Sequence, residues 1–411
     1  MNKSKDYRAI LLMLLTTGIS SYAILQYCDL FYELGMLAKN RLLESPIRAF
    51  FVPPIFFWIS AYLCRKYARS SAGNTATHIE ASLIQLKKTP ESFGKHSAAL
   101  NFRCVMVNAF SSLISTFGGG SLGREGPSVY MSASFFAVIA QKAKKFIPKI
   151  NFENWVLAGS AAGFAIAFHA PLAGFIYVVE KLFHHKSKNF VDNIFWTTVA
   201  LFAVIIVLHK TDPLFEVYKL DMGLGIEIVV IALIAMVCGI LSFFSKEIAV
   251  FLYSKVDAVK GKSWHLIPII AGFMVSIITI YGGAESFSGG IQTARDALSG
   301  EVDLTYTEVG VRILNTVITF VSGCAGGLVA PAVAIGSGIG SIFSHMMENI
   351  DAKIFILSGM ASFLCPVLGL PFATAMVILE TSSQPILAFP FLFFSSGVSF
   401  LTTKLILKLR K

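Results

Sequence analysis

Apolar runs long enough to cross a lipid bilayer dominate the sequence. Roughly 17 to 25 apolar residues span the hydrocarbon layer as a helix, and slightly shorter runs suit tilted or protein-buried segments. Such runs cover residues 9–27, 49–63, 194–208, 226–244 and 267–281. Only 14% of the residues are charged, whereas soluble domains carry about 25%. The sequence therefore predicts an all-α, polytopic membrane protein.

The formal net charge of +10 is carried mainly by the connections between these runs. The basic clusters are Lys3, Lys5 and Arg8; Arg65, Lys66 and Arg69; Lys142, Lys144 and Lys145; Lys404, Lys408 and Arg410. Connections rich in Lys and Arg stay on the cytoplasmic side, so we expect both termini there. Contact with anionic lipid headgroups accounts for the charge, and we expect no nucleic-acid partner. The first run lacks a small-residue cleavage site, which favours a retained helix over a signal peptide.

The sequence does not favour an enzyme, a pump or a metalloprotein. The six cysteines are scattered without a C-x-x-C pair, which predicts buried, reduced thiols and no metal site. Gly118, Gly120 and Gly123 fit G-x-G-x-x-G, but the strand that a dinucleotide site requires does not precede them. No Walker lysine follows a glycine cluster, and no nucleophile–base constellation is present. We expect no cofactor.

Part of the sequence occurs twice. LAGSAAGFAIAFHAPLAGFIYVVE (157–180) aligns without a gap with LSGMASFLCPVLGLPFATAMVILE (357–380), so that Pro171 matches Pro371 and a glutamate closes each copy. Internal repeats are common among transporters. We expect one transmembrane domain (1–411) built of two halves, approximately 1–210 and 220–411. The apolar pattern alone leaves open whether the halves are inverted or parallel.

Two apolar stretches are broken by glycine ahead of a proline, in GREGP (123–127) and GLVAP (327–331). Irregular backbone at membrane depth is tolerated where it is buried in protein or lines a cavity. Proline suits the first turn of a helix, so each motif is expected to begin one, with free amides and a positive end facing the break. Two such helix starts that meet near the midplane form an anion site without a full positive charge.

Arg124 and Glu125 place two charges inside the first of these breaks. An ionisable residue within the membrane is a functional candidate. The structural alternative is an ion pair, but neighbouring residues at a helix start point in different directions. We expect Arg124 to donate to nearby carbonyls and Glu125 to lie beside the helix amides. A carboxylate there mimics a bound anion, which predicts a gate that blocks when charged and opens when protonated.

GREGP followed by Ser-Val, AFHAPLAGFIYVVE, GLVAP and LPFATAMVILE resemble the CLC family of chloride channels and chloride/proton antiporters over nearly the whole chain. The resemblance implies an inverted repeat of tilted and broken helices, and a homodimer with one chloride path per subunit in a bacterial inner membrane. It implies a gating glutamate at Glu125. Because the sequence stops soon after the last apolar segment, we expect no cytoplasmic nucleotide-binding domain. The anion-binding positions that we predict are Gly73, Asn74, Arg124, Gly126, Leu328 and Val329.

The sequence departs from the family at three functional positions. Asn74 stands where the family usually has the serine of G-S-G-I-P; an amide NH₂ still donates to an anion, but fluoride or another anion becomes an alternative to chloride. Lys181, after Glu180, replaces the inner proton-transfer glutamate of coupled members, and a charged lysine is a poor proton relay. The family's inner-gate tyrosine has no match in the final segment. We expect weak or absent proton coupling; the alternative is proton-coupled antiport, with Glu180 as a candidate acid.

Three other features are assigned structural roles. His169 is expected to be a packed loop histidine rather than a titrating group. Arg312 lies in an apolar run and is expected to bind a carbonyl or carboxylate rather than a transported ion. GSGIG (336–340) resembles the missing loop motif, but it falls inside a predicted helix and indicates helix packing through small residues.

Overall fold

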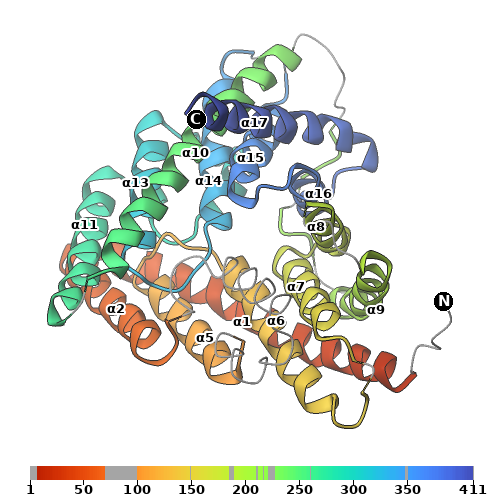
Figure 1. Cartoon of the computed structure of the whole chain (residues 1–411). Helices are drawn as coiled ribbons and strands as arrows, with labels where there is room; N and C mark the ends of the chain where they lie inside the picture. The colour runs from red at the N-terminus through yellow and green to blue at the C-terminus, as the bar shows by residue number, and fades with distance from the viewer. Residues whose placement is uncertain are drawn as a thin grey trace.

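The computed structural model describes residues 7–69, 100–148, 150–184, 189–209, 212–215, 217–220, 227–259, 261–347 and 350–410. These residues are mainly helical (Figure 1). In this part of the chain six helices are long and apolar enough to cross a membrane. They are α1 (Tyr7–Leu43), α2 (Pro46–Tyr67), α9 (Phe190–Leu208), α10 (Glu227–Asp257), α11 (Leu266–Gly282) and α17 (Phe389–Leu409). The prediction of an all-α, polytopic membrane protein is confirmed.

Shorter helices follow one another in a repeated order. The first set is α5 (Phe102–Phe117), α6 (Glu125–Ala143), α7 (Phe152–Phe168) and α8 (Pro171–His184). The second set is α13 (Tyr306–Val321), α14 (Val329–Ser344), α15 (Ala352–Leu368) and α16 (Pro371–Thr381). GREGP leads into α6 and GLVAP into α14, and α6 packs along α7 as α14 packs along α15. The short α12 (Ile291–Ser299) precedes the second set.

The corresponding helices α8 and α16 lie side by side although they are far apart in the sequence (Figure 1). Glu180, near the end of α8, accepts hydrogen bonds from the amides of Phe372 and Ala373 in the first turn of α16. Glu380, near the end of α16, accepts hydrogen bonds from the equivalent amides in the first turn of α8. Each helix therefore ends where the other begins. This antiparallel exchange is the arrangement of an inverted repeat.

Small side chains pack the interior where helices approach closely. A Cβ atom on Gly336 would lie 2.4 Å from the carbonyl oxygen of Gly359, and one on Gly340 would lie 2.3 Å from that of Phe355. GSGIG thus brings α14 against α15, which confirms its predicted role in helix packing. All six cysteines are buried and free, as the sequence predicted.

Candidate functional site

The two glycine–proline breaks meet in the folded chain. The amide of Gly123 donates to the carbonyl of Gly327 at 2.7 Å, and the amide of Gly327 donates to the carbonyl of Gly123 at 2.8 Å. Helix α6 begins at Glu125 and α14 begins at Val329, just beyond this bridge. Since glycine has no Cβ, the backbone of Gly126 also approaches Gly327 closely, and a Cβ there would lie 2.9 Å from the Gly126 nitrogen. One helix start from each half is brought together.

Both helix starts offer backbone donors. The first amides that bond to a carbonyl at the helix start are those of Ser128 in α6, at 2.9 Å, and Ala332 in α14, at 3.0 Å. Pro127 and Pro331 have no N–H group. The amides just before each proline have no carbonyl partner within their own helix, so they can donate to another group. They also form the positive end of the helix dipole. The helix starts predicted from GREGP and GLVAP are therefore present, with Gly126 and Val329 in their first turns.

Arg124 is buried and holds the start of α6 against two other helices. Its Nη1 donates to the carbonyl of Cys28 in α1 at 2.9 Å, and its Nη2 donates to the carbonyl of Ala167 in α7 at 3.5 Å. These contacts match the expectation that the guanidinium binds carbonyls. The guanidinium therefore holds the backbone at the start of α6 against α1 and α7, while Arg124 is the sequence neighbour of Glu125.

Glu125 is 1% exposed, and neither of its carboxylate oxygens makes a hydrogen bond of normal length and angle among the described residues. The nearest donors to the carboxylate are the backbone amides of Glu125 itself and of Ala330, in the first turns of α6 and α14. A buried polar group without a partner costs free energy, more so when charged. Such a group in a folded protein needs a specific explanation, and a bound water, a bound ion or a functional role can supply it. The first turn of α6 provides a local positive field, which stabilises negative charge at this position. Glu125 is thus a strong candidate for a group that changes its charge or position.

A pocket with about 520 Å³ of empty space, part of it open to solvent, adjoins this carboxylate. One wall is formed by α1, with Tyr32 and Lys39, and the other by the segment 287–293. Arg124, Glu125 and Ala330 also line it. The pocket gives Glu125 a path toward solvent that its low exposure alone would not suggest.

The remaining predicted anion-binding residues are distributed differently. Gly73 and Asn74 lie outside the described residues. Leu328 lines a second pocket together with residues of α10, α13, α14 and α15, and it is not among the residues that line the pocket of Glu125. The predicted contact of the Leu328 backbone amide with an anion stays a prediction.

The adjacent residues Glu180 and Lys181 make unlike contacts. Both oxygens of Glu180 bind amides at the start of α16. Lys181 is 8% exposed, and its Nζ donates to the hydroxyl of Tyr177 at 3.0 Å. The ring of Tyr177 stacks on Phe164, with centroids 4.6 Å apart. The sequence analysis did not predict that Glu180 caps α16. The glutamate at the end of each repeat copy was the feature from which this cap could have been predicted.

His169 ends a helix against a neighbouring segment, and Arg312 makes the carbonyl contact that was expected of it. His169 ends α7 with a left-handed φ of 53°, and its Nδ1 lies 2.9 Å from the carbonyl oxygen of Asp212. Arg312 is buried and donates to the carbonyl of Ser288 at 3.3 Å and to the hydroxyl of Thr293 at 3.1 Å. Ser288 and Thr293, the two partners of Arg312, line the pocket of Glu125. The sequence did not predict that Arg312 lies near this pocket.

Comparison with known proteins gives concordant matches. The family model described as voltage gated chloride channel matches residues 56–404. The H(+)/Cl(-) exchange transporter ClcA of Vibrio cholerae is 25% identical over 425 residues, covering 97% of this chain and 87% of the relative. A solved CLC-type fluoride/proton antiporter has a TM-score of 0.78 at 17% identity, covering 98% of this chain and 97% of its own. A slow cyanobacterial Cl-/H+ antiporter has a TM-score of 0.76 at 15% identity, covering 98% and 96%. At these identities the structures show a shared fold.

Proposed function

The chain belongs to the voltage gated chloride channel family, and on that premise we propose that it carries small anions, first of all chloride, across a bacterial inner membrane. The observation that supports the proposal is the buried carboxylate of Glu125, which lies near the amides of Glu125 and Ala330 but makes no hydrogen bond of normal geometry among the described residues. It lies where one helix start from each half meets. Free amides and positive helix ends stabilise an anion without a full cationic charge.

Glu125 acts as the gate in this proposal. When it is ionised, its carboxylate takes the place of a transported anion beside the first turns of α6 and α14. When it is protonated, it loses its attraction for the helix amides and moves into the adjoining pocket, so that an anion replaces it. Arg124 keeps the start of α6 in place through its bonds to Cys28 and Ala167. Gly126, Val329 and Leu328 contribute backbone amides, and Gly73 and Asn74 complete the site.

We further propose that proton coupling is weak or absent. Lys181 occupies the position of the inner acid of coupled relatives, and its ammonium donates to Tyr177. A fixed positive charge there repels protons and attracts anions. Glu180 is the nearest alternative acid, but its oxygens accept hydrogen bonds from α16, and these stabilise the ionised form.

Two related functions stay in competition with this one. Proton-coupled chloride exchange is favoured by the name of the ClcA relative. Transport of fluoride or another anion is favoured by Asn74, which replaces the usual serine. In each case we propose a homodimer with one path per subunit and with both termini in the cytoplasm. In this orientation α1 ends on the outer side, and the contact of Lys39 with Glu285, which follows α11, puts the end of α11 on the same side.

Purified protein in liposomes tests the proposal through the charge moved per chloride ion, with and without a proton gradient. We expect chloride efflux that stops when its electrical charge is not compensated, and a reversal potential set by chloride alone. A potential displaced by the proton gradient at fixed stoichiometry would instead establish exchange. Absence of anion movement under all gradients would reject transport.

A further inference from the structure

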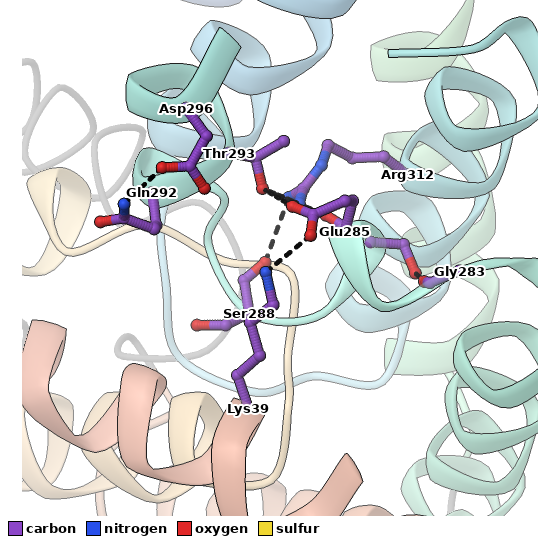
Figure 2. Close-up of polar contacts among 9 residues, drawn as sticks. Lys39, Gly283, Glu285, Ser288, Gln292, Thr293, Asp296 and Arg312 are labelled. Carbon is purple, nitrogen blue, oxygen red and sulfur yellow. Dashed lines mark hydrogen bonds and ion pairs between the residues drawn. The ribbon is translucent and has the colours of Figure 1, made fainter. Parts of the chain in front are cut away.

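A chain of polar contacts lies at the edge of the pocket that adjoins Glu125 (Figure 2). Lys39, near the end of α1, donates from Nζ to Oε1 of Glu285 at 2.8 Å. The hydroxyl of Thr293 donates to Oε2 of Glu285 at 2.9 Å and accepts a hydrogen bond from Arg312 at 3.1 Å. The carboxylate of Glu285 is therefore held by an ammonium and a hydroxyl, with a guanidinium behind the hydroxyl. Donors of this kind also bind a small inorganic anion.

The cluster is built into the fold rather than formed by mobile surface side chains. The side chains of Lys39 and Glu285 are 21% and 19% exposed, and Arg312 is 3% exposed. Gly290 has a φ of +83°, and a Cβ there would lie 2.2 Å from Nη1 of Arg312, so glycine leaves the room that the guanidinium fills. Burying a cation is costly unless a counter-charge compensates it. Glu285 provides that negative charge for both Lys39 and Arg312.

Other charged groups around Glu285 have partners of their own. Asp296 of α12 accepts from Gln292 (Figure 2), and Arg295 donates to the carbonyl of Leu214. Glu308 of α13, which approaches Gly283, accepts from Thr305. Helix α11 presents no charged side chain within its bounds. Lys39 and Arg312 are thus the cations that a neutral Glu285 would leave uncompensated.

We propose that Lys39, Thr293 and Arg312 form a second anion-binding site in front of Glu125, and that the carboxylate of Glu285 is its built-in occupant. The site captures an incoming inorganic anion when Glu285 is neutralised or displaced, and passes it along the pocket to Glu125. This inference rests on the proposed transport of anions and on the orientation that puts the ends of α1 and α11 outside.

The electrostatics of Glu285, which lies outside the membrane-spanning helices, fit this role. Burial by itself would raise its pKa, but the hydrogen bond and charge of Lys39, the hydrogen bond from Thr293 and the charge of Arg312 together hold the pKa below its usual value. A depressed pKa means that the contact with Lys39 is present at neutral pH and is lost as the pH falls through that low value. At neutral pH the site therefore opens when an incoming anion displaces the carboxylate, and only acid stronger than an ordinary glutamate needs for protonation opens it by neutralising Glu285.

Chloride titration of the purified protein by calorimetry tests the inference. At neutral pH, Glu285→Gln is expected to bind chloride about fivefold more tightly than the wild type, or to bind an additional ion, because one counter-charge near Lys39 is gone. The gain should disappear in Lys39→Gln/Glu285→Gln. Glu301→Gln, which removes the same charge from an exposed position beyond α12, is the matched control and should titrate like the wild type. Identical titrations of wild type and Glu285→Gln, or a gain that survives loss of Lys39, would overturn the proposal.

A second measurement avoids dependence on one variant. In a Glu125→Gln background, acidification should tighten chloride binding, and the further change Lys39→Gln should remove that effect; unchanged binding on acidification would reject the site. Chloride efflux from liposomes made with the same preparations separates the two proposals. No efflux from the wild type rejects the proposed function, whereas normal efflux with unchanged titrations rejects only the second site.

Discussion

Glu180→Gln and Glu380→Gln are expected to destabilise the protein by similar amounts, because the two carboxylates cap opposite ends of one antiparallel helix pair. Glu180 accepts hydrogen bonds from the amides of the second and third residues of α16 at 3.2 and 2.8 Å. Glu380 accepts hydrogen bonds from the amides of the second and third residues of α8 at 3.1 and 2.6 Å. These donors have no carbonyl partner within their own helix.

The expected magnitude follows from these contacts. A hydrogen bond to a charged group contributes about 1.5–3 kcal/mol, and negative charge at a helix start adds about 0.3–1 kcal/mol. Glutamine keeps one acceptor oxygen but loses the second bond and the charge, so each variant should lose about 2–3 kcal/mol. The sites lie at opposite ends of α8, which at 14 residues is about 20 Å long. Effects at such a separation usually add, so the double variant should lose about 4–6 kcal/mol.

Unfolding of the purified protein in a single detergent, followed by the fluorescence of its tryptophans, measures these losses. Trp155 is fully buried and reports on the interior around α7. Glu301→Gln at an exposed position serves as the control. Single variants that unfold like the control, or a double variant no weaker than either single one, would refute the capping argument. If Glu180→Gln kept full stability but abolished proton movement, Glu180 would instead be an internal proton donor.

Three further predictions concern the transport path. Lys181→Glu should produce measurable proton coupling, because it restores an acid and breaks the contact with Tyr177; an unshifted reversal potential under opposed chloride and proton gradients would contradict this. Asn74→Ser should shift the preference toward chloride over nitrate in competition assays, and identical competition would remove Asn74 from the site. Leu328→Ile and Val329→Ile should barely change anion affinity in calorimetry, because backbone amides make the contact; a tenfold loss in either variant would show that the side chain binds.

The repeat and the broken helices could be predicted from the sequence because their signals are local. Apolar length indicated the spanning helices, and glycine ahead of proline marked the starts of α6 and α14. The same local pattern predicted different roles for the two neighbours: Arg124 was expected to donate to carbonyl oxygens, as it does, and Glu125 to lie beside the helix amides. GSGIG was assigned to helix packing because it lies beyond the proline that opens α14, and the contact of Gly336 with Gly359 bears this out.

The contacts between distant segments could not be predicted in this way. Glu180 and Glu380 align as the closing residues of two copies, but only the antiparallel placement of α8 and α16 makes each the cap of the other helix. Lys39 and Glu285 belong to different halves, and no local pattern relates them. A weak signal existed, since Lys39 follows the first apolar run (9–27), on the side opposite to the basic cluster of Lys3, Lys5 and Arg8 that was assigned to the cytoplasm.

The pH dependence of chloride flux in Glu125→Gln tests the gate most directly. Wild-type flux into liposomes should change as the pH falls, because protonation moves the carboxylate away from the two helix starts. Glu125→Gln, with a neutral side chain of the same shape, should keep chloride flux but show no pH dependence and no proton movement. Glu301→Gln removes a carboxylate from an exposed position and should retain the pH dependence of the wild type. A pH dependence or proton movement that persists unchanged in Glu125→Gln would contradict the assignment of Glu125 as the gate.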